Sequence, residues 1–185
     1  MKKSYDYFKT LKILSELISV IYEKTLLKQD SSSDRISFFA EKSEFLNNLQ
    51  IEFITPFERG DIFLLAESLT EELNSIFALQ EYLNLINVNH LYQFNEIQKS
   101  LKKQNLIVSQ LKNFKSNIKL FEFCSDEIKN LNSDKKNIEK YIIEAIKCKS
   151  EQPLIRYAAY SGLLDLNQKL YKTILQIERI LIDNS

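Results

Sequence analysis

Two glycines and two prolines are the only residues of those types in this chain of 185 residues. A β-protein reverses its strands at turns that need glycine, proline or an Asn-Gly pair, and neither Asn-Gly nor Asp-Gly occurs here. Long helices need far fewer such turns, and the abundant Leu, Lys, Glu and Gln residues favour helix. We therefore expect an all-α protein, and the length of the chain corresponds to a single domain, residues 1–185.

Apolar residues recur at helical spacing along the chain and predict six helices. The first spans about 5–28, and the second, capped by Ser33 or a neighbouring serine, ends near 53. The third runs from Pro56 to about 85, with a break at 87–90. The fourth follows that break, the fifth covers about 118–147 with room for an interruption near 130–133, and the last begins at Pro153. The apolar stripes comprise Leu14, Leu17, Ile18 and Ile21; Ile36, Phe39, Leu46 and Leu49; Leu65, Leu69, Leu73, Ile76 and Phe77; Phe94, Ile97, Leu101, Val108 and Leu111; and Leu163, Leu166, Leu170, Ile174, Ile177 and Leu181.

The segment Thr55-Pro56-Phe57-Glu58 gives the sharpest predicted boundary. Threonine at the N-cap, proline at the first helical position and glutamate three residues after the cap together form a capping box. Proline suits that position because it has no N–H to leave unpaired and its φ is already helical. The pattern predicts that the third helix starts at Pro56.

The prolines lie at positions 56 and 153, about half the chain apart, and each is predicted to open a helix. Aligning the segments at this offset pairs Arg59 with Arg156 and places the leucines of both helices in one register. We interpret this as a weak internal repeat of three helices, with pseudo-repeats at 1–88 and 91–185.

The 25 basic residues balance the 25 acidic residues, so no net field favours nucleic acid and no nucleic-acid partner is expected. No apolar run reaches the roughly 20 residues of a membrane span, and the first residues lack the apolar stretch of a signal peptide. Cys124 and Cys148 are too few and too far apart for a disulfide framework or a zinc site, which predicts reduced, half-buried thiols. A cytoplasmic location follows.

Few catalytic arrangements are possible, because His90 is the only histidine and the glycines stand only at 60 and 162. Neither a Ser-His-Asp triad, a histidine-based metal motif nor a glycine-rich phosphate loop can be built from them. Paired carboxylates are the remaining route to a site: Glu67 and Glu71 share one helix face, and Asp165 lies beside the last apolar stripe. Ordinary surface acids are the alternative, with Asp165 paired to Lys169 at i+4.

The run from Phe53 to Ile62, followed by Leu65, Ala66 and Leu69, resembles the signature of the phosphate transport regulator family related to PhoU. In that family the segment is Phe-Ile-Thr-Pro-Phe/Ile-Asp-Arg-Glu-Asp-Ile, and members often accompany Pit-type phosphate transporters. The resemblance implies a six-helix body made of two antiparallel three-helix bundles, and a cytosolic regulator that is not an enzyme. The matching family-signature residues are Thr55, Pro56, Arg59 and Asp61. Thr55 and Pro56 would set a helix start, Arg59 would pair with an acid on a neighbouring helix, and Asp61 would suit the helix dipole.

The sequence departs from the metal motifs of PhoU-like proteins, which place acidic pairs on inner helices. The family's acidic run falls on Thr70, Glu71 and Asn74, and on the last helix only Asp165 matches, with Lys169 in the second acidic position. The pair expected on the second helix falls near Arg35, or on Ser37 and Phe39. Such groups cannot replace carboxylates around a multivalent ion. We therefore expect no cofactor and a divalent or iron cluster site that is lost or weakened, with Glu67, Glu71 and Asp165 as vestigial candidates.

The resemblance predicts an accessory regulator of inorganic phosphate transport that docks on a Pit-type transporter or its signalling partners. It would reach the inner face of the membrane only through that partner. Phe38 and Phe39, and Phe121 and Phe123, are candidate docking residues, because neighbouring aromatics cannot all face one core stripe. Two alternatives stay open: a metal-binding bundle that retains a reduced carboxylate site, and a homodimeric coiled-coil scaffold with the shape of an extended rod. A homo-oligomer is compatible with the sequence.

Overall fold

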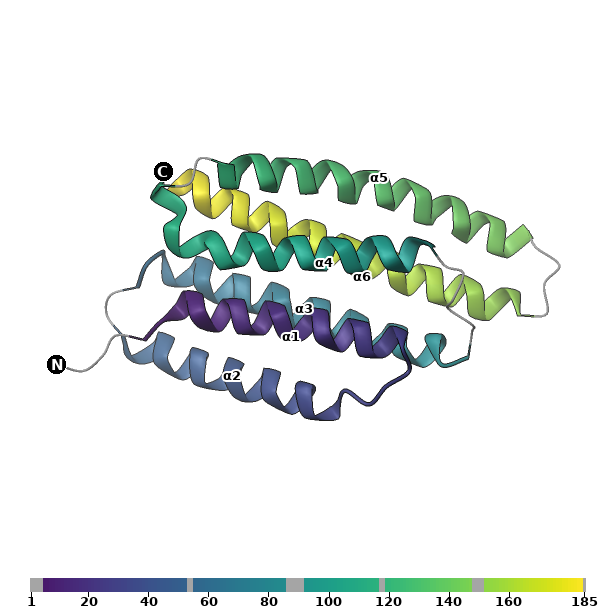
Figure 1. The fold of residues 1–185 in the computed structure, drawn as a ribbon, viewed down its shortest axis with the longest axis horizontal. Coiled ribbons are helices and arrows are strands. Elements are labelled where there is room, and N and C mark those ends of the chain that lie inside the picture. Colours follow the sequence, from purple (N-terminus) through teal and green to yellow (C-terminus); the bar gives the residue numbers. More distant parts are fainter. Residues whose placement is uncertain (1–4, 53–54, 86–91, 117–118, 148–151, 185) are drawn as a thin grey trace.

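The computed structural model describes residues 5–52, 55–85, 92–116, 119–147 and 152–184. These ranges contain helices and no strand, which confirms the all-α prediction. Figure 1 shows the helices stacked side by side, with successive helices running in opposite directions. The helices are α1 (Tyr7–Leu26), α2 (Ser32–Ile51), α3 (Arg59–Leu83), α4 (Tyr92–Gln110), α5 (Lys119–Lys147) and α6 (Pro153–Asp183), with a short 3-10 turn (Leu111–Ser116) after α4.

The inner helices α1, α3, α4 and α6 pack on one another, whereas α2 and α5 lie on opposite outer sides (Figure 1). Helix α1 contacts α2, α3 and α4, and helix α6 contacts α3, α4 and α5. The outer helices are not equivalent, because α5 follows α6 along much of its length while α2 has only a slight contact with α3. The core therefore lies between the two halves of the chain as well as within each half.

The apolar stripe of α6 is buried as the sequence predicts, from Leu163 through Leu166, Leu170, Ile174 and Ile177 to Leu181. Its neighbours are α3 and α5 of the same chain. Since the stripe is already covered within one molecule, it does not offer the seam of an extended coiled-coil rod. The described helices form one bundle rather than an extended rod, and homodimerisation stays a prediction.

The prediction for the buried face of α2 was right for Leu49 and Leu46 but wrong for Ile36 and Phe39. Ile36 is 72% exposed and Phe39 is 45% exposed, whereas Phe38, Phe45 and Leu49 are buried. Helix α2 rests mainly on α1, and Phe45 lies edge-on to the Tyr7 ring with 5.5 Å between ring centroids. A helix with one main neighbour buries a narrow face, so a few well-packed aromatic side chains decide its rotation.

The predicted start of the third helix was also wrong, because α3 begins at Arg59 rather than at Pro56. The Thr55 hydroxyl donates to the carbonyl oxygen of Phe57 at 2.6 Å instead of capping a helix. Phe57 is buried, with its ring centroid 5.3 Å from that of Phe8 and 5.0 Å from that of Phe114. Burying this ring holds the chain in a turn before the helix. The two prolines are therefore not equivalent, since only Pro153 opens its helix.

Other boundaries are close to those expected. Helix α2 begins at Ser32, but the serine cap was wrong: Ser31 at the N-cap makes no side-chain capping bond, and the Asp30 carboxylate accepts from the Ser32 N–H at 3.0 Å. Helix α3 ends at Leu83, and α5 continues through 130–133 without a break.

Cys124 is fully buried rather than half-buried, whereas His90, Cys148 and the break at 87–90 lie outside the described residues. Among the helices described, none is both long and apolar enough to cross a membrane.

Candidate functional site

The seam between α3 and α6 brings the two halves of the chain together and carries most of the predicted site residues. The helices are antiparallel and approach closely at Gly162, where a Cβ atom would lie 3.2 Å from Leu79 Cδ1 and 3.7 Å from Leu79 Cα. Glycine therefore permits the short distance between the two helices. Towards the C-terminus of α6, leucine and isoleucine side chains alternate with polar pairs that join the two helices.

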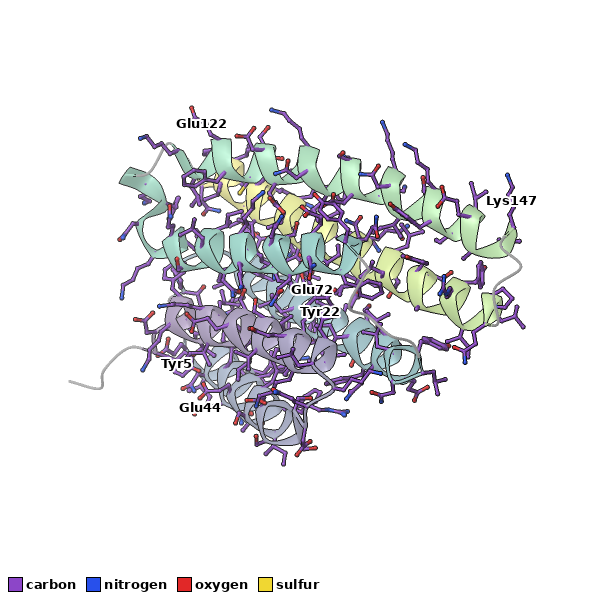
Figure 2. The ribbon with its side chains drawn as sticks, turned by 45° about the vertical axis from the view of Figure 1, so that its right-hand side comes forward. Tyr5, Tyr22, Glu44, Glu72, Glu122 and Lys147 are labelled. Carbon is purple, nitrogen blue, oxygen red and sulfur yellow. The ribbon has the colours of Figure 1, made fainter. Side chains whose placement is uncertain are left out.

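A buried carboxyl group lies in the interior of this seam. Gln104 Nε2 of α4 donates to Glu72 Oε2 at 2.8 Å, and the Thr173 hydroxyl of α6 donates to Glu72 Oε1. Figure 2 shows Glu72 and Tyr22 within the helical body, while Glu44, Glu122 and Lys147 lie on its outside. Burial raises the pKa of Glu72 to about 7, against the lowering effect of its two hydrogen bonds. The group therefore holds or releases a proton near neutral pH.

Polar pairs also flank Glu72 on the outside of the seam. The Ser68 hydroxyl donates to Gln176 Oε1 at 2.9 Å, and the Ser75 hydroxyl donates to Asp165 Oδ2. Each pair joins one residue of α3 to one of α6. These contacts tie α3 to α6 in one register.

The three predicted carboxylates do not converge on one point. Glu67 pairs with Lys42 of α2 at 2.8 Å, and Glu71 pairs with Lys169 of α6 at 2.8 Å. Asp165 accepts from Ser75 rather than pairing with Lys169. The Lys169 ammonium lowers the pKa of the Glu71 carboxyl. Within the described part of the chain, no three Asp, Glu, Cys or His side chains are grouped closely enough to hold a metal ion.

An apolar groove of about 490 Å³ lies where the first turns of α3 meet the last turns of α6. Three of its aliphatic side chains are strongly exposed: Leu64 by 52%, Leu175 by 44% and Ile182 by 59%. Charged groups of both signs surround them, namely Asp61, Lys172, Glu178 and Arg179. Such a groove suits an amphipathic segment that buries an apolar stripe and pairs its charges at the rim.

The signature residues are divided between two places. Asp61 lies in the first turn of α3, where its charge suits the helix dipole, and lines the groove. Thr55 and Pro56 line a separate hollow of about 350 Å³ with Tyr5–Phe8 and Lys112. Arg59 is exposed, and the ion pairs between described residues do not include it, contrary to its predicted role.

The predicted aromatic pairs each divide between core and surface. Phe38 is buried while Phe39 is 45% exposed, and Phe121 packs partly against the core while Phe123 is 40% exposed. Sequence reasoning missed Glu72, Gln104 and Thr173, although a signal was available. Each of these polar residues stands within an apolar stripe: Glu72 follows Leu69 by three residues, Gln104 follows Leu101 by three, and Thr173 follows Leu170 by three.

Comparison with protein-family models gives no match for this chain, and comparison with curated proteins gives no significant match.

Proposed function

We propose that the chain is a non-enzymatic, cytosolic regulator of inorganic phosphate transport with the PhoU-like architecture of two three-helix bundles. It acts by docking on a Pit-type transporter or on a signalling partner of that transporter. In this proposal the protein reaches the inner face of the membrane only through its partner.

The pattern of helix contacts supports the duplicated architecture. The first helices of the two halves, α1 and α4, pack together, and so do the third helices, α3 and α6. The second helices, α2 and α5, occupy opposite outer sides (Figure 1). A rotation that exchanges the halves would produce this arrangement of pairs. The Thr-Pro-x-x-Arg-x-Asp run supports the same assignment, although its proline lies before the helix instead of at its start.

The groove between α3 and α6 is the observation that carries the docking proposal. It combines exposed Leu64, Leu175 and Ile182 with charges of both signs. Exposed apolar side chains grouped in a hollow are typical of interaction sites. The proposed occupant is an amphipathic segment of the transporter or its partner, which would place its apolar stripe on these three residues.

The proposal also includes a degenerate metal site. Glu67 and Glu71 each pair with a lysine ammonium, and Asp165 accepts from a serine hydroxyl. A lysine beside a carboxylate competes with a multivalent cation for the same oxygens. Metal analysis of the purified protein tests this part: stoichiometric iron, zinc or nickel would contradict it and support the metal-binding alternative.

Phosphate uptake in cells that lack the gene tests the regulator proposal. We expect the deletion to change the uptake rate of radiolabelled phosphate and the wild-type gene to restore it. A Leu64→Asp/Leu175→Asp variant places two charges in the groove without disturbing the core, and should fail to restore the rate. Its co-purification with the transporter or signalling partner should fall about tenfold or more.

The matched control is Leu154→Asp, because Leu154 is 80% exposed at the opposite end of α6. This variant should restore uptake as the wild type does, and circular dichroism should show the same helix content in all three proteins. Unchanged uptake after deletion would refute the regulator assignment. Full restoration by the groove variant would refute the docking site alone.

A further inference from the structure

A second pocket lies between α4 and α5, away from the α3–α6 groove. Its volume is about 350 Å³, within the range of small-molecule sites in proteins. One wall is apolar and consists of Leu106, Ile107 and Phe123, with Leu106 and Phe123 about half exposed. The other wall is polar and consists of Lys103, Asp126, Glu127 and Asn130. A ligand that fits both walls has an apolar body and one polar end.

Glu127 determines which kind of polar group the pocket favours in a ligand. Its side chain is 1% exposed, yet Oε1 has no hydrogen-bond partner among the described residues. The other oxygen, Oε2, lies 2.9 Å from Lys103 Nζ and accepts from Asn130 Nδ2 at 3.2 Å. A buried carboxylate oxygen without a donor loses its hydration and gains nothing in return. A ligand ammonium that takes the place of Lys103 would supply a donor to this carboxylate.

The charges around the pocket favour a cationic donor. Burial raises the pKa of Asp134, two turns beyond Glu127 on α5, the negative charges of Glu96 and Glu127 raise it further, and Lys103 and Lys99 lower it. Asp126 adds another carboxylate to the rim, where it pairs with Lys129 at 3.1 Å. The Lys103 side chain is 50% exposed, and a half-exposed lysine can rotate away at little cost.

We propose that the pocket between α4 and α5 binds a small primary amine with an apolar or aromatic tail. Its ammonium group displaces Lys103 and donates to the Glu127 carboxylate, and its tail lies against Leu106, Ile107 and Phe123. Lys103 already places an ammonium against the same carboxylate, and therefore acts as a tethered competitor of the ligand. This site is independent of the proposed role in phosphate transport and uses none of the groove residues.

Phenethylamine is the probe, because it joins one ammonium group to one phenyl ring. Titration into the isotope-labelled full chain, followed by amide chemical shifts, should give a dissociation constant of about 1 mM for a ligand of this size. The shifted amides should cluster near Leu106, Ile107 and Phe123. The neutral analogue 2-phenylethanol and the anionic analogue 3-phenylpropionate should bind about tenfold more weakly, because neither supplies a charged donor.

Two substitutions should change the affinity in opposite directions. Glu127→Gln removes the charge at nearly constant shape and should weaken phenethylamine binding about tenfold. Lys103→Gln removes the competitor and should strengthen binding about threefold, because only the lysine side of this ion pair is exposed to solvent. Lys102→Gln, at the neighbouring exposed position of α4, is the matched control and should leave binding unchanged.

Absence of phenethylamine binding to the wild-type protein would overturn the proposal. Equal binding of the amine and 3-phenylpropionate would also overturn it, because it would show that Glu127 does not contribute to binding. Weaker binding in Lys103→Gln would mean that the lysine belongs to the site rather than competing for it, and would likewise contradict the inference. If Glu127→Gln alters the folded state, the Lys103 and Lys102 variants still decide the question.

Discussion

Replacing Glu72 by glutamine should make the stability of the protein less dependent on pH. The Glu72 carboxyl has an ordinary pKa of 4.5 in the unfolded chain and about 7 in the folded protein, mainly because it is buried. The folded state therefore retains a proton that the unfolded state releases between these two values. The resulting stabilisation is complete below about pH 4.5 and is lost as the pH rises through 7.

The size of the effect follows from this interval. The interval from 4.5 to about 7, at about 1.36 kcal/mol per pH unit, corresponds to roughly 3 kcal/mol of unfolding free energy. Glu72→Gln cannot ionise, and its amide can donate to Gln104 Oε1, a buried oxygen that has no partner among the described residues. The variant should therefore match the wild type near pH 5 and exceed its stability by about 2–3 kcal/mol near pH 8.

Urea unfolding followed by circular dichroism at several pH values measures this difference, and suits a chain that has no tryptophan. Glu81→Gln, an exposed position on the same helix, is the control and should not change the pH dependence. The reasoning would be refuted if the stabilities of wild type and Glu72→Gln ran parallel from about pH 5 to about pH 8. That result would mean that Glu72 has the same affinity for protons in both states.

Three further substitutions test the packing of the helices. Tyr22→Phe removes the hydroxyl that donates to the carbonyl oxygen of Phe94 at 3.0 Å. Urea unfolding should show a free energy of unfolding lower by about 1–2 kcal/mol for this buried bond. An unchanged free energy would mean that the hydrogen bond makes no net contribution to stability. Gly60→Ala should raise the melting temperature, because nothing lies within 4 Å of its new Cβ and alanine favours helix by up to about 1 kcal/mol. Gly162→Ala should raise the melting temperature less, or lower it, because the Leu79 side chain must move. Equal changes in melting temperature for the two glycine variants would contradict the close approach of α3 and α6 at Gly162.

The sequence alone predicted the helices well, because helix formation depends on residues three and four positions apart. The stripe of α6 from Leu163 to Leu181 is buried as expected, and α5 has nearly its predicted length. The pattern fails where few apolar residues define a face. In α2, Ile36 and Phe38 both fit helical periodicity, and contact with α1 decides that Phe38 is the buried one.

The candidate site was predicted less completely than the fold. Glu67, Glu71 and Asp165 were identified as chemically interesting carboxylates. Their partners are, respectively, Lys42 of α2, Lys169 of α6 and Ser75 of α3. Their spacing along the chain gave no information on those partners. Glu72 was missed because a polar residue within an apolar stripe does not by itself indicate burial.

The amino-acid order determined by itself that this chain is helical, where most helices lie and which residues of α3, α4 and α6 enter the core. These properties arise from local backbone preferences and from a periodicity that is visible along one segment. The tertiary structure decided that Phe57 delays the start of α3, that Glu72 meets Gln104 and Thr173, and that Glu127 lines a pocket. Each of these depends on side chains from segments far apart in the sequence, and only the packed helices bring those groups within contact distance.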